Sequence, residues 1–166
     1  CSHMGLTEMA GIRFGNCTGN FYCDYNNLTS LQGVPRKVGG NFSCSNNKLT
    51  TLVGCPQQVA KSFNCSGNLL TSLKGAPKKV INFDCSVNKI TSLEGAPQGV
   101  IKFFCFSNKN LVSLKGIPPI IVEQFNCWDI GITNPTVDKL WDVIRNKEKT
   151  YEEALIYVWD KIPEED

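Results

Sequence analysis

Residues 83–97 read FDCSVNKITSLEGAP, and nearly the same sequence recurs at 21–35, 42–56 and 63–77. A copy with one inserted residue, FFCFSNKNLVSLKGIP, spans residues 103–118, and a degenerate copy, FNCWDIGIT, begins at Phe125. The phenylalanines that open successive copies are separated by 21, 21, 20, 20 and 22 residues. Self-similarity at this period is typical of a repeat architecture, in which each unit buries its apolar face against its neighbours.

Each copy begins with the pattern F-x-C, which predicts a short strand. Because side chains alternate along a strand, the Phe and Cys point inward and the residues around them point outward. The asparagine that follows is predicted to be buried and to satisfy backbone groups where each coil turns. A glycine two residues before a proline marks the return turn. The predicted asparagine column is Asn26, Asn47, Asn68, Asn88 and Asn108.

Nine cysteines are present, and six of them share one column of the repeat: Cys23, Cys44, Cys65, Cys85, Cys105 and Cys127. Stacked coils place these residues in a buried ladder with a spacing of roughly 5 Å. We interpret them as reduced, small hydrophobic residues of a cytosolic protein. Disulfides between neighbours in the ladder are the alternative. A linear ladder cannot surround a metal ion tetrahedrally, and no C-x-x-C pair occurs, so no metal site is predicted.

The repeat, with its F-x-C strand, Asn and Leu-x-x-Leu, resembles the strand segment of leucine-rich repeats with Phe and Cys in Leu positions. In this short, Cys-rich form it is similar to leucine-rich-repeat proteins of bacteria and large tailed bacteriophages. The resemblance covers about residues 20–132. It implies an α/β repeat solenoid with a short parallel β-sheet, used for protein binding. For a phage-encoded chain it also implies a host protein as the partner, in the host cytoplasm.

The chain divides into four predicted segments. Residues 1–4 (CSHM) are interpreted as a cloning scar, 5–20 as an N-terminal cap, 21–133 as a leucine-rich-repeat solenoid of about six coils, and 134–166 as a two-helix C-terminal cap. Apolar residues recur with helical spacing over 135–146 and 151–162, after a plausible N-cap at Asn134. The helices either cover the open end of the last coil or offer a face to a partner. No run of 18 apolar residues occurs, so no membrane-spanning helix is predicted.

Charge is unevenly distributed along the chain, although the net charge is only +2. Residues 5–122 carry +8 and residues 123–166 carry −6. Arg36, Lys37, Lys78 and Lys79 follow turn prolines, and Lys48, Lys89 and Lys109 follow column asparagines. A solvated rim is the simplest interpretation of these residues. A basic stripe that follows a phosphate backbone is the alternative.

The outward strand positions change character along the solenoid. In the middle coils they are small and polar, whereas the fifth and sixth coils carry aromatic residues. Exposed aromatic clusters favour an interface, and packing beneath the C-terminal helices is the alternative. The predicted partner-binding residues are Phe104, Phe106 and Trp128, with Tyr22 and Tyr25 at the other end and Ser45, Ser66 and Ser86 between.

Catalytic motifs are absent from the sequence. It has no Gly-rich phosphate loop, HExxH or GxSxG motif, and its one histidine is His3. Asp24 and Asp84 lie three coils apart, about 15 Å, beyond the roughly 9.5 Å limit for paired catalytic carboxylates. We therefore predict a non-catalytic protein–protein interaction module without a cofactor, in the cytoplasm, with a nucleic-acid binder as the alternative. The sequence leaves the oligomeric state open.

Overall fold

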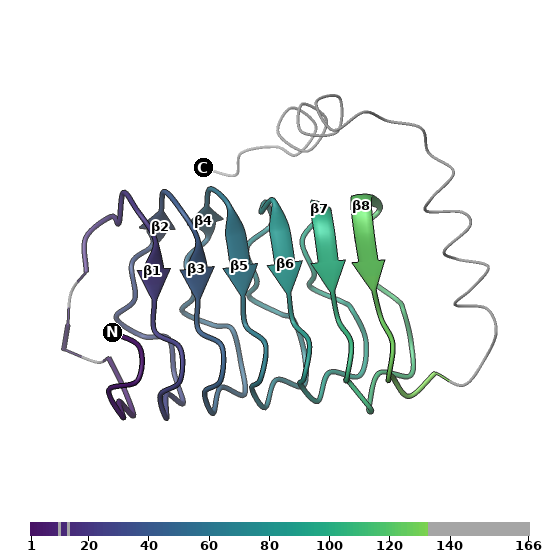
Figure 1. Ribbon diagram of the computed structural model, residues 1–166, viewed down its shortest axis with the longest axis horizontal. Coiled ribbons are helices and arrows are strands. Elements are labelled where there is room, and N and C mark those ends of the chain that lie inside the picture. Colours follow the sequence, from purple (N-terminus) through teal and green to yellow (C-terminus); the bar gives the residue numbers. More distant parts are fainter. Residues whose placement is uncertain (10, 13, 133–166) are drawn as a thin grey trace.

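The protein is a parallel β-solenoid, seen in a computed structural model that describes residues 1–9, 11–12 and 14–132 (Figure 1). One strand from each Phe-containing repeat enters a six-stranded sheet. In spatial order its strands are β1 (Phe21–Tyr22), β3 (Phe42–Ser43), β5 (Ser62–Asn64), β6 (Asn82–Asp84), β7 (Gly99–Phe104) and β8 (Ile120–Asn126). A smaller parallel pair, β2 (Lys37–Val38) and β4 (Gln58–Val59), forms between the first return segments.

The register of the main sheet follows the repeat. Every strand pairs in parallel with the next, and Phe is opposite Phe throughout: Phe21, Phe42, Phe63, Phe83, Phe103 and Phe125. A one-residue slip would turn each Phe and Cys to the outer face, so burial of these columns fixes the register. The inward and outward positions predicted for the Phe and Cys columns are confirmed.

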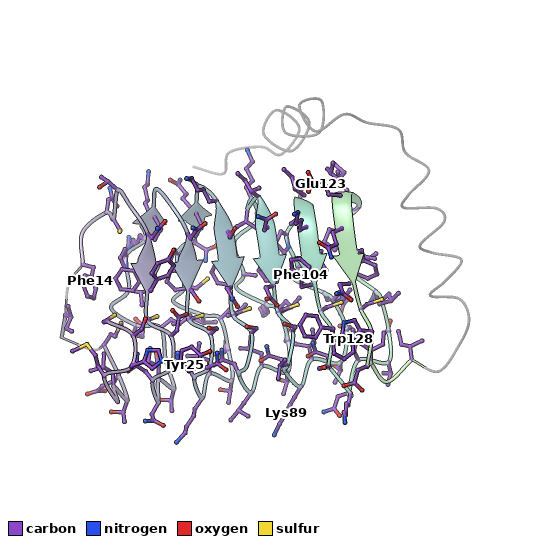
Figure 2. The ribbon with its side chains drawn as sticks, in the orientation of Figure 1. Phe14, Tyr25, Lys89, Phe104, Glu123 and Trp128 are labelled. Carbon is purple, nitrogen blue, oxygen red and sulfur yellow. The ribbon has the colours of Figure 1, made fainter. Side chains whose placement is uncertain are left out.

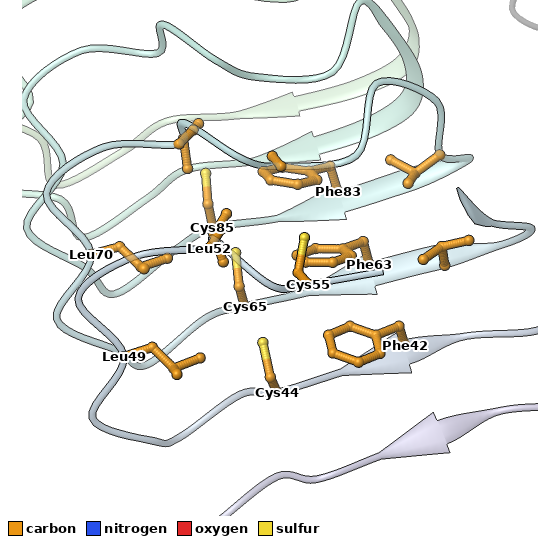
Figure 3. Close-up of a cluster of buried hydrophobic side chains, with 14 of the residues drawn as sticks. Phe42, Cys44, Leu49, Leu52, Cys55, Phe63, Cys65, Leu70, Phe83 and Cys85 are labelled. Atoms are coloured by element: carbon orange, nitrogen blue, oxygen red, sulfur yellow. The ribbon is translucent and has the colours of Figure 1, made fainter. Parts of the chain in front are cut away.

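The core repeats the same buried residue types in each successive coil. Phe42, Phe63 and Phe83 lie in successive coils with their rings above one another, and the column cysteines form a parallel row beside them (Figure 3). Successive rings of the column have centroids between 5.1 and 6.0 Å apart. Offset aromatic contacts in this range add to the free energy gained by burying the rings.

All nine cysteines are free thiols, and the six of the column are buried. Several donate to a carbonyl of the next coil, such as Cys23 Sγ to Ser43 O at 3.3 Å and Cys85 Sγ to Phe104 O at 3.4 Å. Burial raises the pKa of the Cys23 thiol to about 12, and raises the pKa values of Cys44, Cys65 and Cys85 well above the ordinary value. The burial of the cysteine ladder is confirmed.

We expect Cys44, Cys65, Cys85 and Cys105 to resist a thiol reagent in the native protein, because only an accessible thiolate reacts. Cys1 is exposed and supplies an internal positive control. Mass spectrometry of the labelled protein before and after denaturation counts the protected thiols. Rapid native modification of the four ladder cysteines would contradict the buried column.

The asparagine column is also buried, as predicted. Asn68 Nδ2 donates to the carbonyls of Cys44, Cys65 and Ser66 at 3.1 to 3.2 Å, and Asn68 Oδ1 accepts from Leu49 N at 3.0 Å. One side chain therefore satisfies backbone groups of its own coil and of the preceding coil. The same pattern occurs around Asn47 and Asn88.

Each coil turns through a left-handed residue two positions after its column cysteine. Non-glycine residues adopt this conformation at Tyr25, Asn46, Val87, Ser107 and Asp129, with φ between 52° and 54°. The return turns use glycine instead: a Cβ added to Gly116, with φ 85°, would lie 2.5 Å from Glu94 Cα. Consecutive coils approach so closely there that only glycine fits.

Residues 1–9 and 11–12 take the conformation of an incomplete additional coil. CSHMGLTEMAG aligns with CDYNNLTSLQG at 23–33, and His3 and Gly11 have the positive φ of Tyr25 and Gly33. His3 N donates to Asp24 O at 3.1 Å, as Tyr25 N does to Ser45 O at 3.0 Å. The division into a cloning scar at 1–4 and a cap at 5–20 stays a prediction, but both segments contribute residues to this coil.

Residues 1–9, 11–12 and 14–132 contain strands and turns but no helix. The strands and their pairing confirm the solenoid with its short parallel sheet. The α/β designation is not shown by these residues. The predicted two-helix cap at 134–166 lies outside the described residues.

Candidate functional site

Three columns of side chains on the outer face of the main sheet form the strand face. They occupy the positions before the column Phe, between Phe and Cys, and after Cys. In Figure 2, Phe104 and Trp128 project at the β7–β8 end of this face, and Tyr25 lies at the β1 end. The solenoid therefore separates two aromatic groups by polar middle coils.

Phe104, Phe106 and Trp128 form the aromatic patch. Phe104 ends β7, and Phe106 and Trp128 follow β7 and β8 at equivalent positions. The Phe106 and Trp128 rings stack with centroids 4.9 Å apart and planes at 5°. Trp128 remains 58% exposed, while Phe104 and Phe106 are half-buried. The structure stacks two of the three predicted aromatic residues, Phe106 and Trp128, against each other. It places the third, Phe104, at the end of β7, two residues before Phe106.

Charged side chains border the aromatic patch on both sides. Asp84 is the register partner of Phe104 on the neighbouring strand β6. Asp129 follows Trp128, and its Oδ2 accepts from Ser107 Oγ at 3.0 Å. Lys102, at the other end of the patch, pairs with Glu123 at 3.4 Å. The immediate border of the patch is thus net acidic.

Asp84 is partly buried on the strand face. Its Oδ1 accepts from Ser86 N at 2.9 Å and from Ser86 Oγ at 2.5 Å. Burial raises the pKa of the Asp84 carboxyl, and the two bonds from Ser86 offset part of that rise. A desolvated carboxylate therefore lies one strand away from the aromatic patch.

We expect Asp84→Asn to become progressively more stabilising, relative to the wild type, as the pH rises from 4 to 7. The folded-state pKa of Asp84 lies above its unfolded value of 3.8, so the protonated form favours folding and this contribution is lost as the pH rises through the folded-state pKa. The Asn amide oxygen keeps the acceptor used by Ser86. Denaturant melts of both proteins at several pH values measure the difference. A difference in unfolding free energy that does not vary with pH would contradict the burial of this charge.

The other aromatic group lies at the β1 end. Tyr22 and Tyr25 are 42% and 55% exposed, and Tyr25 stacks on His3 with centroids 4.5 Å apart. Beside them is a shallow depression of about 420 Å³, lined by Tyr22, Asp24, Tyr25, Asn41, Phe42, Ser43, Ser45, Ser62 and Asn64. Both tyrosines are accessible where the sequence analysis placed them.

The serine row differs from the expected free polar surface. Ser45 and Ser86 are only 6% and 1% exposed, and Ser66 is half-buried. Ser45 Oγ donates to Asp24 Oδ1 at 3.1 Å, just as the hydroxyl of Ser86 is used by Asp84. Ser45 and Ser86 are therefore less accessible than Tyr22, Tyr25 and Trp128, because closely stacked small side chains are covered by their neighbours.

Sequence reasoning did not identify the two aspartates as the residues that organise these serines. The signal is the short pattern Asp84-Cys-Ser86, in which the carboxylate reaches the serine two residues later. Asn64 behaves in the same way, since its Oδ1 accepts from Ser66 N at 2.9 Å. Local bonds of this kind are typical of Asp and Asn near turns.

A second, larger cavity of about 980 Å³ lies on the return side of the first coils, between Ile12, Phe14, Val34, Arg36 and Gln57 among others. Within the described part of the chain, no three His, Cys, Asp or Glu side chains are grouped as metal ligands. Nor does that part contain a helix long and apolar enough to cross a membrane. No protein-family model, curated protein or solved structure matches the chain.

Proposed function

We propose that this protein is a non-catalytic interaction module that binds a partner protein through the aromatic patch. The observation that carries the proposal is the stacked Phe106–Trp128 pair, with Trp128 largely exposed on a face whose middle coils carry small polar residues. Tryptophan is enriched among the residues that dominate protein interfaces. A large exposed indole costs solubility, and burial by a partner recovers that cost.

The scaffold suits such a role because it holds the patch rigidly. Phe104 lies in β7, and the backbone on both sides of the Phe106–Trp128 pair is fixed by bonds between coils, such as Ser107 N to Trp128 O at 3.0 Å. Little conformational entropy is then lost when a partner binds. Tyr22 and Tyr25 would extend the contact for a partner long enough to follow the strand face.

We propose further that the chain is a short, Cys-rich leucine-rich-repeat protein of the kind found in bacteria and tailed phages, acting on a host protein in the cytoplasm. The support is the repeat itself, in which F-x-C, Asn and Leu-x-x-Leu recur every 20 to 22 residues. Fold resemblance by itself does not name the partner.

Affinity capture from a host lysate tests the binding site. We expect Trp128→Ala to weaken partner capture by about tenfold or more, as removal of an interface hot spot of about 2 kcal/mol implies. Phe106→Ala should weaken capture in the same direction. Thermal melting should change little, because the Trp128 side chain is mostly in solvent. Val53→Ala is the matched control, since Val53 is also exposed but lies in a return segment.

Two results would overturn the proposal. Lowered melting of Trp128→Ala with capture retained would assign the aromatic pair to folding. Capture of DNA or RNA with a steep salt dependence, unaffected by Trp128→Ala, would favour a nucleic-acid binder that uses the basic residues of the coil corners.

A further inference from the structure

The strand face has a charge opposite to that of the solenoid as a whole. The exposed lysines Lys48, Lys89 and Lys109 lie at the coil corners, and Figure 2 shows Lys89 pointing away from the sheet. Around the aromatic patch, by contrast, the described residues offer Asp84 and Asp129, while Lys102 is neutralised by Glu123. A partner surface that fits the patch should therefore be cationic rather than anionic.

The two carboxylates beside the patch each have one acceptor oxygen left over. Asp84 uses Oδ1 for Ser86, and Asp129 uses Oδ2 for Ser107. The residues that the structure describes donate no hydrogen bond to Asp84 Oδ2 or to Asp129 Oδ1. Asp24 differs, because both of its oxygens accept bonds: Oδ1 from Ser43 and Ser45, and Oδ2 from Ser2 at 3.3 Å.

We infer that the partner presents arginine to this site, with a guanidinium group over the exposed Trp128 ring and within reach of the neighbouring Asp129 carboxylate. The inference rests on the proposed function and specifies the chemistry of the segment that binds.

Arginine fits this combination better than other side chains. A cation over an indole face is attracted by the ring's quadrupole, and tryptophan is the strongest such platform. The guanidinium is planar and weakly hydrated, so it can stack on the ring while its edge donates to a carboxylate. A phosphate or an acidic peptide would instead meet two carboxylates. The remaining oxygen of Asp129, Oδ1, is an acceptor, which matches the donor-only guanidinium.

The probe is a capped pentapeptide, Ala-Arg-Ala-Arg-Ala, titrated into the full chain. Its matched control carries citrulline at both arginine positions, which keeps the shape and removes the charge. The readout is the indole N–H resonance of Trp128, identified by its absence in Trp128→Phe. We expect a saturable shift with the arginine peptide and an apparent affinity at least about tenfold weaker for the citrulline peptide.

Variants of the protein test the carboxylate in the same titration. Asp129→Asn should weaken the arginine peptide several-fold, and it keeps an amide oxygen for the bond from Ser107. Asp84→Asn is a second control, because Asp84 lies two strands away from the coil of Trp128, and it should leave the titration nearly unchanged. Val53→Ala should leave the titration unchanged. Equal binding of the arginine and citrulline peptides, or binding unaffected by Asp129→Asn, would overturn the inference. A lysine peptide that binds as tightly as the arginine peptide would also overturn the choice of guanidinium.

The capture experiment tests the proposed function and the titration tests the arginine chemistry, so the two can be contradicted independently. If partner capture depends on Trp128 but the arginine peptide does not shift its resonance, the interaction module stands and the arginine chemistry is wrong. If the arginine peptide binds but no protein is captured through the patch, the cation site stands and the proposed function is wrong.

Discussion

Phe63→Ala should lower the free energy of unfolding by about 3–5 kcal/mol, the usual cost of removing a buried aromatic ring. Phe63 is fully buried between Phe42 and Phe83, with ring centroids 5.1 and 5.5 Å away. Its removal leaves a cavity in the centre of the ring stack, and the coils on both sides lose a contact. Because each coil is stabilised mainly by its neighbours, the loss should extend along the solenoid.

Chemical denaturation monitored by circular dichroism measures this loss. Phe14→Ala is the matched control, because Phe14 is exposed and meets the column only at its end, through an edge contact with Phe21 at 5.0 Å. The control should lose far less stability than Phe63→Ala. Equal losses for the two variants would show that the ring stack does not form the core.

Asn68→Ala should cost about 2–4 kcal/mol, because unpaired buried backbone groups cost about 1–3 kcal/mol each and more than one group is affected. The change removes the donor to three carbonyls and the acceptor for Leu49 N. These groups lie in two successive coils, so the variant loosens the contact between coils as well as one corner. Thermal melting and denaturant titration both report the effect.

Two further variants make the Asn68 result specific. Asn68→Asp keeps the size but replaces the donor with a carboxylate facing three carbonyl oxygens, so it should destabilise at least as much at neutral pH. Asn110→Ala changes an exposed asparagine of the inserted position and should lie within about 0.5 kcal/mol of the wild type. A melting temperature unchanged by Asn68→Ala would refute the structural role of the asparagine column.

The repeat sequence was sufficient to predict the backbone architecture. A Phe, a Cys and an Asn that recur every 20 to 22 residues have one arrangement that buries all of them, namely parallel strands paired Phe to Phe. Even the irregular pairing of β7 with β8 follows from spacing. Val100 lies three residues before Phe103, whereas Ile121 lies four before Phe125, so the register shifts between Val100 and Lys102.

The sequence also predicted which outward positions are unusual, but not how they are organised. Trp128 and Phe106 stand out in columns of small polar residues, and that contrast is visible in the letters. Their stacking, and the exposure of Trp128, depend on the separation of two neighbouring coils. The additional coil formed by residues 1–9 and 11–12 was also not predicted. Its likeness to the repeat is weakened because Met4 replaces the column asparagine and Met9 replaces a leucine.

By itself, the sequence determined the period, the inward columns, the parallel register and the position of the aromatic residues, because these depend on which side chains must leave water. Only the tertiary structure decided which polar side chains remain available to a partner. Ser45 is covered where the stacked coils bring Asp24 of the preceding coil within hydrogen-bonding distance of it, whereas the bond between Ser86 and Asp84 is local and Ser86 is covered by its neighbours in the stack. Hydrogen bonds and exposure on a strand face depend on neighbours 20 residues away, and the identity of a single column does not encode them.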